Sequence, residues 1–382
     1  MTTTPWYAPL GGPLGSNVTA EIESQFRMGV AGRIERPGFM TALPGGVSRR
    51  VTARVNGVDR LAHIAPDGIT GPLFGITGQA AVAAGDLVAL KMDAAGDEGR
   101  ATNALAIFRA AVGHAYLLQA SSVNGLALGV SSARTFSVHG TTLAHANAST
   151  NGRMVMRAAG TAKAPFVQVI SNARTADVVL TLAVNNVDTA VTVTVPAGAT
   201  GLLAGTGEAA FVAGDDLAWR VTGSDSATIV FGSFGLTVVG AAPGLSDIFS
   251  RPTGTVNRSA SATPSYVAIN GQMLPGVNED QRQVALGFPA RLTKLRAQVT
   301  AAAYTATLTL RVNGVGVLSI PIPSGSSGLF EADGPVSVNS SDKVSVEITG
   351  TGSGNVTFAW LGLTVEDVTP PFRPRAAWMS GD

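Results

Sequence analysis

Hydrophobic and polar residues alternate with a period of two in many short stretches of this 382-residue chain. Residues 308–312 read Leu-Thr-Leu-Arg-Val, and residues 318–322 read Leu-Ser-Ile-Pro-Ile. This period is that of a β-strand with one buried face. Asn313 and Gly314 lie between the two stretches and favour a two-residue hairpin, because both residue types tolerate the positive φ of a type I′ turn. The pattern predicts antiparallel β-structure.

The hairpin pattern occurs three times along the chain, as TARVNGV (52–58), LAVNNV (182–187) and LRVNGV (310–315). The first asparagines of these hairpins are 129 and 128 residues apart, at Asn56, Asn185 and Asn313. Each copy continues with a small-residue turn, an aspartate, a new apolar strand and a closing aromatic strand. The recurring aspartates are Asp86, Asp216 and Asp342. Because solenoid repeats have periods of roughly 20 to 50 residues, each copy is predicted to be a domain in its own right.

About eight short strands per copy, separated by Gly, Pro, Asn and Ser clusters, predict an all-β chain of three tandem antiparallel β-sandwich modules. A jelly roll is preferred to an immunoglobulin sandwich, because the Cys and Trp hallmarks of the latter are missing. Breaks in the alternation give the expected boundaries. They are module 1 at 1–112, which is the most divergent, module 2 at 113–243, module 3 at 244–368, and an extended C-terminal arm at 369–382.

Composition narrows the function classes. Hydrophobic residues make up 45% and charged residues 13% of the chain, which excludes disorder. The net charge is +1 without a basic block, so nucleic acid is not expected as a partner. Cysteine is absent, which removes disulfides and thiolate chemistry. No run of 18 apolar residues predicts a membrane span, and the first residues lack the pattern of a secretion signal.

Motifs for catalysis, cofactors or metals are not found, so no enzyme, no cofactor and no metal site is predicted. The four histidines include no pair at the i, i+4 spacing of a zinc site. The glycine-rich stretch 350–354 lacks the lysine and helix of a phosphate loop. The recurring aspartates are interpreted as turn caps that accept backbone N–H groups. Weak calcium binding at acidic loops such as 93–98 stays open.

Aromatic residues outside the regular strands are the candidate interface residues, since aromatics are enriched at protein interfaces and in sugar-stacking sites. Packing between modules is the simpler alternative. The candidates are Trp6, Tyr7, Tyr116, Tyr266, Phe372 and Trp378.

Two further expectations concern the end of the chain. Val356, Phe358 and Trp360 alternate, so Trp360 is predicted to lie in the core of the third module. The arm at 369–382 contains three prolines that withhold backbone donors, so it is not expected to extend a sheet. Because it keeps Phe372 and Trp378, it is predicted to dock on a neighbouring subunit or another protein.

The repeated Gly/Ala/Thr-rich modules and their Val-Asn-Gly-Val hairpins resemble the jelly-roll virion proteins of tailed bacteriophages and gene transfer agents, including fibres, spikes, decoration proteins and receptor-binding tips. The resemblance is one of architecture and composition over almost the whole chain, and it carries no functional residue. It implies location in the virion, other virion proteins as partners, and homotrimers packed about a threefold axis. Three modules in one chain would also permit an intrachain pseudo-trimer.

The leading hypothesis is therefore a structural virion protein. It would be either a tail or head fibre that touches a host surface polysaccharide, or a decoration or adaptor protein on the capsid or tail. The alternative is an extracellular carbohydrate-binding or adhesin protein with three lectin-like modules, which the missing secretion signal disfavours. Position in the particle, receptor and oligomeric state stay open at this point.

Overall fold

A computed structural model describes residues 6–8, 25–41, 49–65, 71–74, 78–94, 101–111, 113–129, 133–141, 145–146, 152–242, 244–251, 256–259, 264–269, 271–272, 276–352 and 354–368. These residues form β-strands joined by turns, with one short 3₁₀ helix, η3 (Glu279–Gln281). The expectation of an all-β chain with antiparallel sheets is confirmed, although two short pairs, 120–121 with 140–141 and 250–251 with 271–272, run parallel. Each sheet takes its strands from one of three sections, called here the N-terminal unit (β1–β9), the central unit (β10–β21) and the C-terminal unit (β22–β32).

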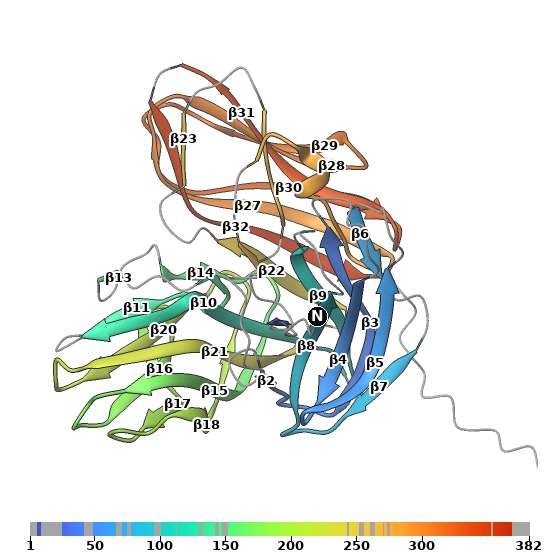
Figure 1. The fold of residues 1–382 in the computed structure, drawn as a ribbon. Coiled ribbons are helices and arrows are strands. Elements are labelled where there is room, and N and C mark those ends of the chain that lie inside the picture. The colour runs from blue at the N-terminus through green and yellow to red at the C-terminus, as the bar shows by residue number, and fades with distance from the viewer. Residues whose placement is uncertain are drawn as a thin grey trace, which may run out of the picture.

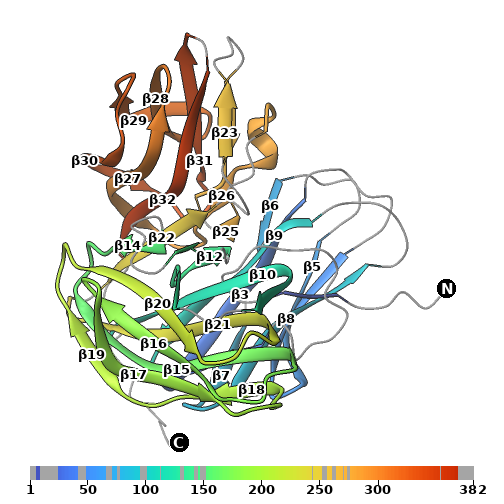
Figure 2. The same ribbon diagram turned by 90° about the vertical axis from the view of Figure 1, so that its left-hand side faces the viewer.

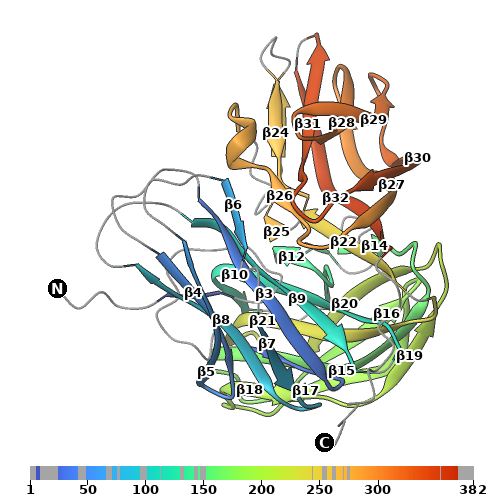
Figure 3. The same cartoon turned by 90° about the vertical axis from the view of Figure 1, so that its right-hand side faces the viewer.

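The three units lie side by side, as the blue, green and orange-red groups of strands in Figure 1 show. The C-terminal unit lies above the other two when the molecule is turned to either side (Figures 2 and 3). The strands of one unit end at residue 110 and those of the next begin at 115, and the second change falls between 240 and 245.

The N-terminal unit has two sheets. One runs β1-β8-β4-β5, with β2 also on β8. In the other, β6 and β7 pair with β3, and β9 pairs with β3 over most of its length. The strands are β1 (Trp6–Ala8), β2 (Phe26–Arg27), β3 (Gly32–Thr41), β4 (Arg49–Val55), β5 (Val58–Ala65), β6 (Gly71–Phe74), β7 (Gln79–Val82), β8 (Leu87–Ala94) and β9 (Ala101–Ala110).

The central unit has the sheets β12-β10-β21-β15-β18, with β19 also on β15, and β13-β11-β20-β16-β17, with β14 also on β20. The strands are β10 (Ala115–Gly129), β11 (Arg134–Phe136), β12 (Gly140–Thr141), β13 (His145–Ala146), β14 (Met154–Val155), β15 (Gly160–Asn172), β16 (Val178–Val184), β17 (Val187–Val195), β18 (Gly201–Ala204), β19 (Glu208–Phe211), β20 (Asp216–Gly223) and β21 (Thr228–Gly240).

The C-terminal unit repeats this order, with the sheets β25-β22-β32-β27-β30 and β24-β31-β28-β29; β23 also pairs with β32, and β26 with β31. The strands are β22 (Leu245–Arg251), β23 (Val256–Ser259), β24 (Ser265–Val267), β25 (Gly271–Gln272), β26 (Val284–Ala285), β27 (Ala290–Ala302), β28 (Thr305–Val312), β29 (Val315–Ile322), β30 (Gly328–Val338), β31 (Lys343–Thr351) and β32 (Asn355–Asp367).

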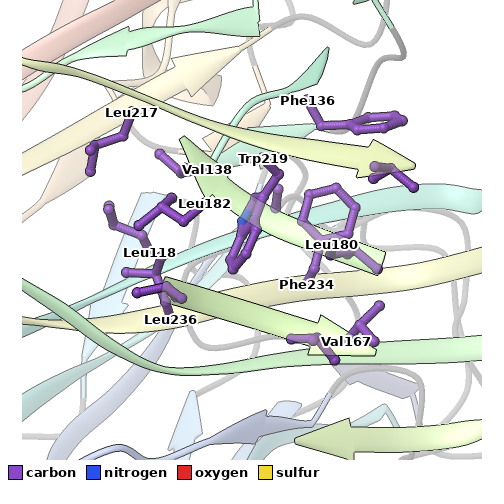
Figure 4. Close-up of a cluster of buried hydrophobic side chains, with 14 of the residues drawn as sticks. Leu118, Phe136, Val138, Val167, Leu180, Leu182, Leu217, Trp219, Phe234 and Leu236 are labelled. Atoms are coloured by element: carbon purple, nitrogen blue, oxygen red, sulfur yellow. The ribbon is translucent and has the colours of Figure 1, made fainter. Parts of the chain in front are cut away.

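The two sheets of each unit bury their facing sides against each other. In the central unit, Trp219 on β20 and Phe234 on β21 meet edge to face, with 6.3 Å between ring centroids. Leu118, Leu180 and other aliphatic side chains of both sheets surround them (Figure 4). Separate buried clusters occupy the C-terminal and N-terminal units. The structure is therefore all-β and sandwich-like, with buried hydrophobic side chains between its sheets.

The predicted hairpin turns are confirmed. Asn313 has a φ of 51° and Gly314 a φ of 80°, and Asn56 and Gly57 have φ values of 51° and 76°. In the central unit both turn residues are asparagines with positive φ, Asn185 and Asn186. These residues adopt the left-handed backbone that a type I′ turn needs.

Each turn is held by an aspartate from the neighbouring strand junction. Asp342 accepts hydrogen bonds from the Asn313 side chain (2.9 Å) and from the backbone N–H of Asn339 (2.7 Å). These backbone and side-chain bonds lower the pKa of Asp342. Asp86 makes the same contacts in the N-terminal unit. In the central unit the residue is Asp215, so the prediction of Asp216 was wrong by one position, while the role as a turn cap is confirmed.

Trp360 is fully buried, but not on the predicted face. Val299 lies opposite Phe358 and Gln298 lies opposite Trp360, so Ala359 is an extra residue in the ladder. Such a β-bulge reverses the facing of the residues that follow it. Phe358 therefore points into the C-terminal interior, whereas Trp360 joins the buried cluster of the central unit. The prediction that Trp360 fills the core of its own module was wrong.

Candidate functional site

The most distinctive side chains of the chain lie where the units meet. Two of these contacts use residues at corresponding positions of corresponding strands, on β10 and β15 in the central unit and on β22 and β27 in the C-terminal unit. Leu117 on β10 lies opposite Thr237, and Asp247 on β22 lies opposite Thr364. Thr237 belongs to β21 and Thr364 to β32. On the other side of these two strands, Phe166 on β15 lies opposite Gly235, and Arg296 on β27 lies opposite Gly362. Leu117 and Phe166 therefore correspond in position to Asp247 and Arg296.

Matching glycines let these side chains lie against the sheet. A Cβ atom added at Gly235 would come within 2.8 Å of the Phe166 ring. One added at Gly362 would come within 3.1 Å of Phe249 and 3.2 Å of the Arg296 guanidinium carbon. Any larger residue at either glycine would push the side chain away from the sheet.

The contact between the N-terminal and central units is mainly apolar. Phe166 belongs to the buried cluster of the N-terminal unit, and its ring meets that of Phe26 edge to face at 4.9 Å. Leu117 and Leu202 pack against the same cluster. One polar contact accompanies them, because the backbone N–H of Gly29 donates to Thr237 Oγ1 at 3.0 Å.

The contact between the central and C-terminal units is centred on a buried carboxylate. Asp247 Oδ2 accepts hydrogen bonds from the backbone N–H groups of Arg157 (2.7 Å) and Ala158 (2.8 Å), which belong to the central unit. Asp247 Oδ1 accepts from Thr364 Oγ1 at 2.8 Å and from Arg296 at 2.6 Å. Both oxygens of the carboxylate thus have two donors, which is what a buried charge requires.

Arg296 completes this site from β27. Its side chain and that of Asp247 are both 0% exposed. The guanidinium also donates to the backbone oxygen of Val155 in the central unit, and it lies 5.0 Å from the ring centroid of Phe249. Burial lowers the pKa of Arg296, and the nearby Asp247 opposes that shift. The pair joins the two units and has no access to solvent.

Further contacts surround the buried pair. Trp360 Nε1 donates to the backbone oxygen of Arg153 at 2.9 Å, and the Trp360 ring meets that of Phe249 edge to face at 5.5 Å. At the rim, Arg157 pairs with Glu331 at 2.6 Å. An apolar and aromatic surround with a charged rim is the anatomy of a permanent interface.

A third contact joins the N-terminal and C-terminal units. Arg109 at the end of β9 donates to Asp367 at the end of β32 at 2.8 Å. Arg109 also pairs with Glu35 at 3.0 Å and lies 5.9 Å from the ring centroid of Phe288. These ion pairs raise the pKa of Arg109 against the opposing effect of its burial. Each unit therefore touches both of the others.

The candidate interface residues have different surroundings. Trp6 and Tyr7 lie on β1, with backbone pairing to Met92 and Lys91. Tyr116 is buried in the central cluster, and this burial, helped by Asp247, raises its pKa well above the ordinary value. Tyr266 is half-buried, with the guanidinium of Arg311 5.6 Å from its ring centroid. Phe372 and Trp378 lie outside the described residues, as does the C-terminal arm.

The residues that join the units were missed by sequence reasoning. Phe166, Asp247 and Arg296 lie within strands and look like ordinary members of an alternating pattern. The sequence nevertheless contained a signal, because an alignment of the copies makes Asp247 equivalent to Leu117 and Arg296 equivalent to Phe166. Two positions that are apolar in one copy and carry opposite charges in the next indicate a buried charge pair.

Within the described residues, no three His, Asp or Glu side chains gather as a metal site would require. Asp97 and Glu98 of the acidic loop lie outside those residues. The same part of the chain contains no helix with the length and apolar character of a membrane crossing. The arrangement described above can hold units together. No protein-family model matches this chain, and no curated protein is significantly similar to it.

Proposed function

We propose that the chain is a structural component of a bacteriophage or phage-like virion, built from three tandem jelly-roll modules. It would act as a tail or head fibre, or as a decoration or adaptor protein, with other virion proteins as partners. The observation that carries the proposal is the burial of the Asp247–Arg296 ion pair at the contact between two units, where the carboxylate accepts four hydrogen bonds. Such chemistry serves permanent assembly.

The strand order supports the jelly-roll part of the proposal. Taking β10, β11, β15, β16, β17, β18, β20 and β21 as eight main strands, one sheet holds the first, eighth, third and sixth. The other sheet holds the second, seventh, fourth and fifth. Strands from both ends of the section alternate in each sheet, as in a double Greek key. The C-terminal unit has the same order.

The contacts between units support an intrachain pseudo-trimer. The N-terminal unit contacts the central unit through Phe26 and Phe166, the central unit contacts the C-terminal unit through Arg157 and Asp247, and the C-terminal unit returns to the N-terminal unit through Asp367 and Arg109. The first two contacts use corresponding strand positions. One chain would then occupy the place of a homotrimer. Light scattering of the purified chain is expected to give one chain's mass, 38.7 kDa. A mass of three chains would contradict the pseudo-trimer while leaving the virion role open.

Electron microscopy of particles from the source tests the virion role. Particles from a strain without this gene should lack a discrete density that the wild-type particles carry. A strain with Arg296→Met serves as a second arm, because the weakened contact should lower incorporation of the protein. If the particles are unchanged and the protein is found on the cell surface, the adhesin alternative gains and the virion proposal is wrong.

A further inference from the structure

Among the described strands of the N-terminal unit, β9 has one edge without a neighbouring strand. In the central unit β21 pairs with β15 on one side and β10 on the other, and in the C-terminal unit β32 pairs with β27 and with β22 and β23. The corresponding strand β9 pairs with β3 alone among the described strands. A free edge exposes a row of backbone donors and acceptors that can accept another strand.

The missing neighbour has a defined place. β10 begins opposite Val239, the residue before the last one of β21, and β22 begins opposite Glu366, the residue before the last one of β32. The corresponding residue of β9 is Arg109. A strand that completes the N-terminal unit should therefore begin beside Arg109 and run antiparallel to β9.

The end of β32 lies at this same place. Asp367, the last residue of β32, accepts a hydrogen bond from Arg109 at 2.8 Å. In the other units the next strand begins five residues after the preceding one ends, from 110 to 115 and from 240 to 245. The same interval after Asp367 leads to Phe372. We infer that residues 372–378 form the missing strand on the free edge of β9 within the same chain.

The prolines of this segment fit the inferred register. Gly240 donates its N–H to the oxygen of His114, so the ladder bonds between β10 and β21 fall on the even-numbered residues of β10 at this end. Pro374 corresponds to Leu117, at a position whose N–H points away from the ladder. Pro370 and Pro371 come before the strand, where proline is tolerated. The prolines therefore do not bar this segment from the edge of a sheet.

The inference identifies the docking partner of the C-terminal arm as the N-terminal unit. Main-chain pairing of this kind is strand addition to an exposed edge. It needs only the correspondence of β9 with β21 and β32, and it does not depend on a virion role. Failure of the experiments below would leave the particle assay untouched.

Amide hydrogen exchange with single-residue resolution tests the pairing. The N–H groups of Phe108 and Ala110 should point to the free edge, because Ala111, one residue on, donates to Ala31, the residue just before the neighbouring strand β3. In the full chain both amides should exchange at least 10-fold more slowly than in a variant that ends at Val368. The Arg109 amide, which faces β3, is the internal control and should change little. Equal exchange of Phe108 and Ala110 in both chains would overturn the inference.

Two adjacent alanines provide a matched pair of variants. Ala377→Pro removes an N–H that the register directs at β9, whereas Ala376→Pro removes one that points away. The first should expose the Ala104 amide, which pairs with Ala377 in this register, and the second should leave it protected. If both variants behave alike, the register is wrong.

A disulfide decides whether the strand comes from the same chain. Because the sequence has no cysteine, Arg109→Cys with Phe372→Cys introduces a single pair at facing positions. Oxidation should give a cross-linked monomer in denaturing electrophoresis. Cross-linked dimers instead would show that a second copy supplies the strand, and the absence of any cross-link would count against the docking.

Discussion

The two contacts made by the central unit occupy corresponding positions but use opposite chemistry. Phe166 fills its place by apolar burial against Phe26, while Arg296 fills the matching place as half of a buried ion pair. Apolar burial is favourable without a partner of defined geometry. A buried charge must find its counter-charge and donors, and here Asp247 has four donors. The same strand geometry therefore supports two kinds of contact. The Phe166 contact is tolerant, because it needs only apolar neighbours, and the Arg296 contact is demanding, because it needs a counter-charge and hydrogen-bond donors.

The largest effect is expected where the demanding contact loses one partner. Arg296→Met leaves Asp247 buried without its counter-charge, which should lower the free energy of unfolding by about 3 to 5 kcal/mol. Denaturant unfolding monitored by tryptophan fluorescence measures the change. Arg291→Met is the control, because Arg291 pairs with Glu366 at an exposed site and should matter by about 0.2 to 1 kcal/mol. A loss for Arg296→Met as small as that of the control would contradict the burial of the pair.

A loss of similar size is expected at the tolerant contact, for a different reason. Phe166→Ala leaves a cavity between the N-terminal and central units and should cost about 3 to 5 kcal/mol. Phe166→Leu, which keeps most of the volume, should cost far less. Thermal unfolding of the two variants would show this difference, and equal melting temperatures would mean that the site is not tightly packed.

The hairpin turns lie outside both contacts and should respond independently of them. Asn313→Val with Gly314→Val forces two β-branched residues to positive φ, at about 1 to 2 kcal/mol each. Unfolding of the C-terminal unit should shift accordingly. Asn313→Gly keeps the backbone freedom and separates the turn from the loss of the Asp342 hydrogen bond. A double valine variant that melts like wild type would refute the role of the turn.

Converting one contact into the other is expected to have a smaller effect. Asp247→Leu with Arg296→Phe copies Leu117 and Phe166 into the C-terminal unit. Replacing a buried ion pair by apolar residues is often neutral or stabilising, but the Arg157 and Ala158 amides lose an acceptor at about 1 to 3 kcal/mol. We expect a stability within about 2 kcal/mol of wild type. If the double variant is no better than Arg296→Met, the two sites are not equivalent.

The smallest effect is expected at the third contact. Arg109 and Asp367 have side chains that are 25% and 19% exposed, so solvent screens their pairing. Arg109→Met should lower the free energy of unfolding by about 0.2 to 1 kcal/mol. Its cost should shrink further when salt is raised, which a titration with sodium chloride would measure. A loss above that of Phe166→Ala would mean that this contact carries more of the assembly than its exposure suggests.

The sequence predicts the strands and turns well, because alternation and Asn-Gly pairs are local signals. It fails where a distant strand decides the outcome. The facing of Trp360 depends on a bulge at Ala359, which does not show in the alternation of Val356 and Phe358. Asp247 and Arg296 are 49 residues apart, and nothing local indicates that they meet. The contacts between units therefore had to come from the structure.

The buried pair also affects how a chain of similar units folds. Tandem copies can pair with the wrong neighbour while they fold, since their surfaces share one geometry. If the Phe166 face of a second chain took the place of Arg296 against Val155, the amides of Arg157 and Ala158 would meet no carboxylate. If the C-terminal unit docked beside Phe26 instead, Asp247 would move together with Arg296, but it would lose the amides of Arg157 and Ala158. Either error would cost several kcal/mol. We therefore expect the ion pair to favour the correct neighbour while the units assemble.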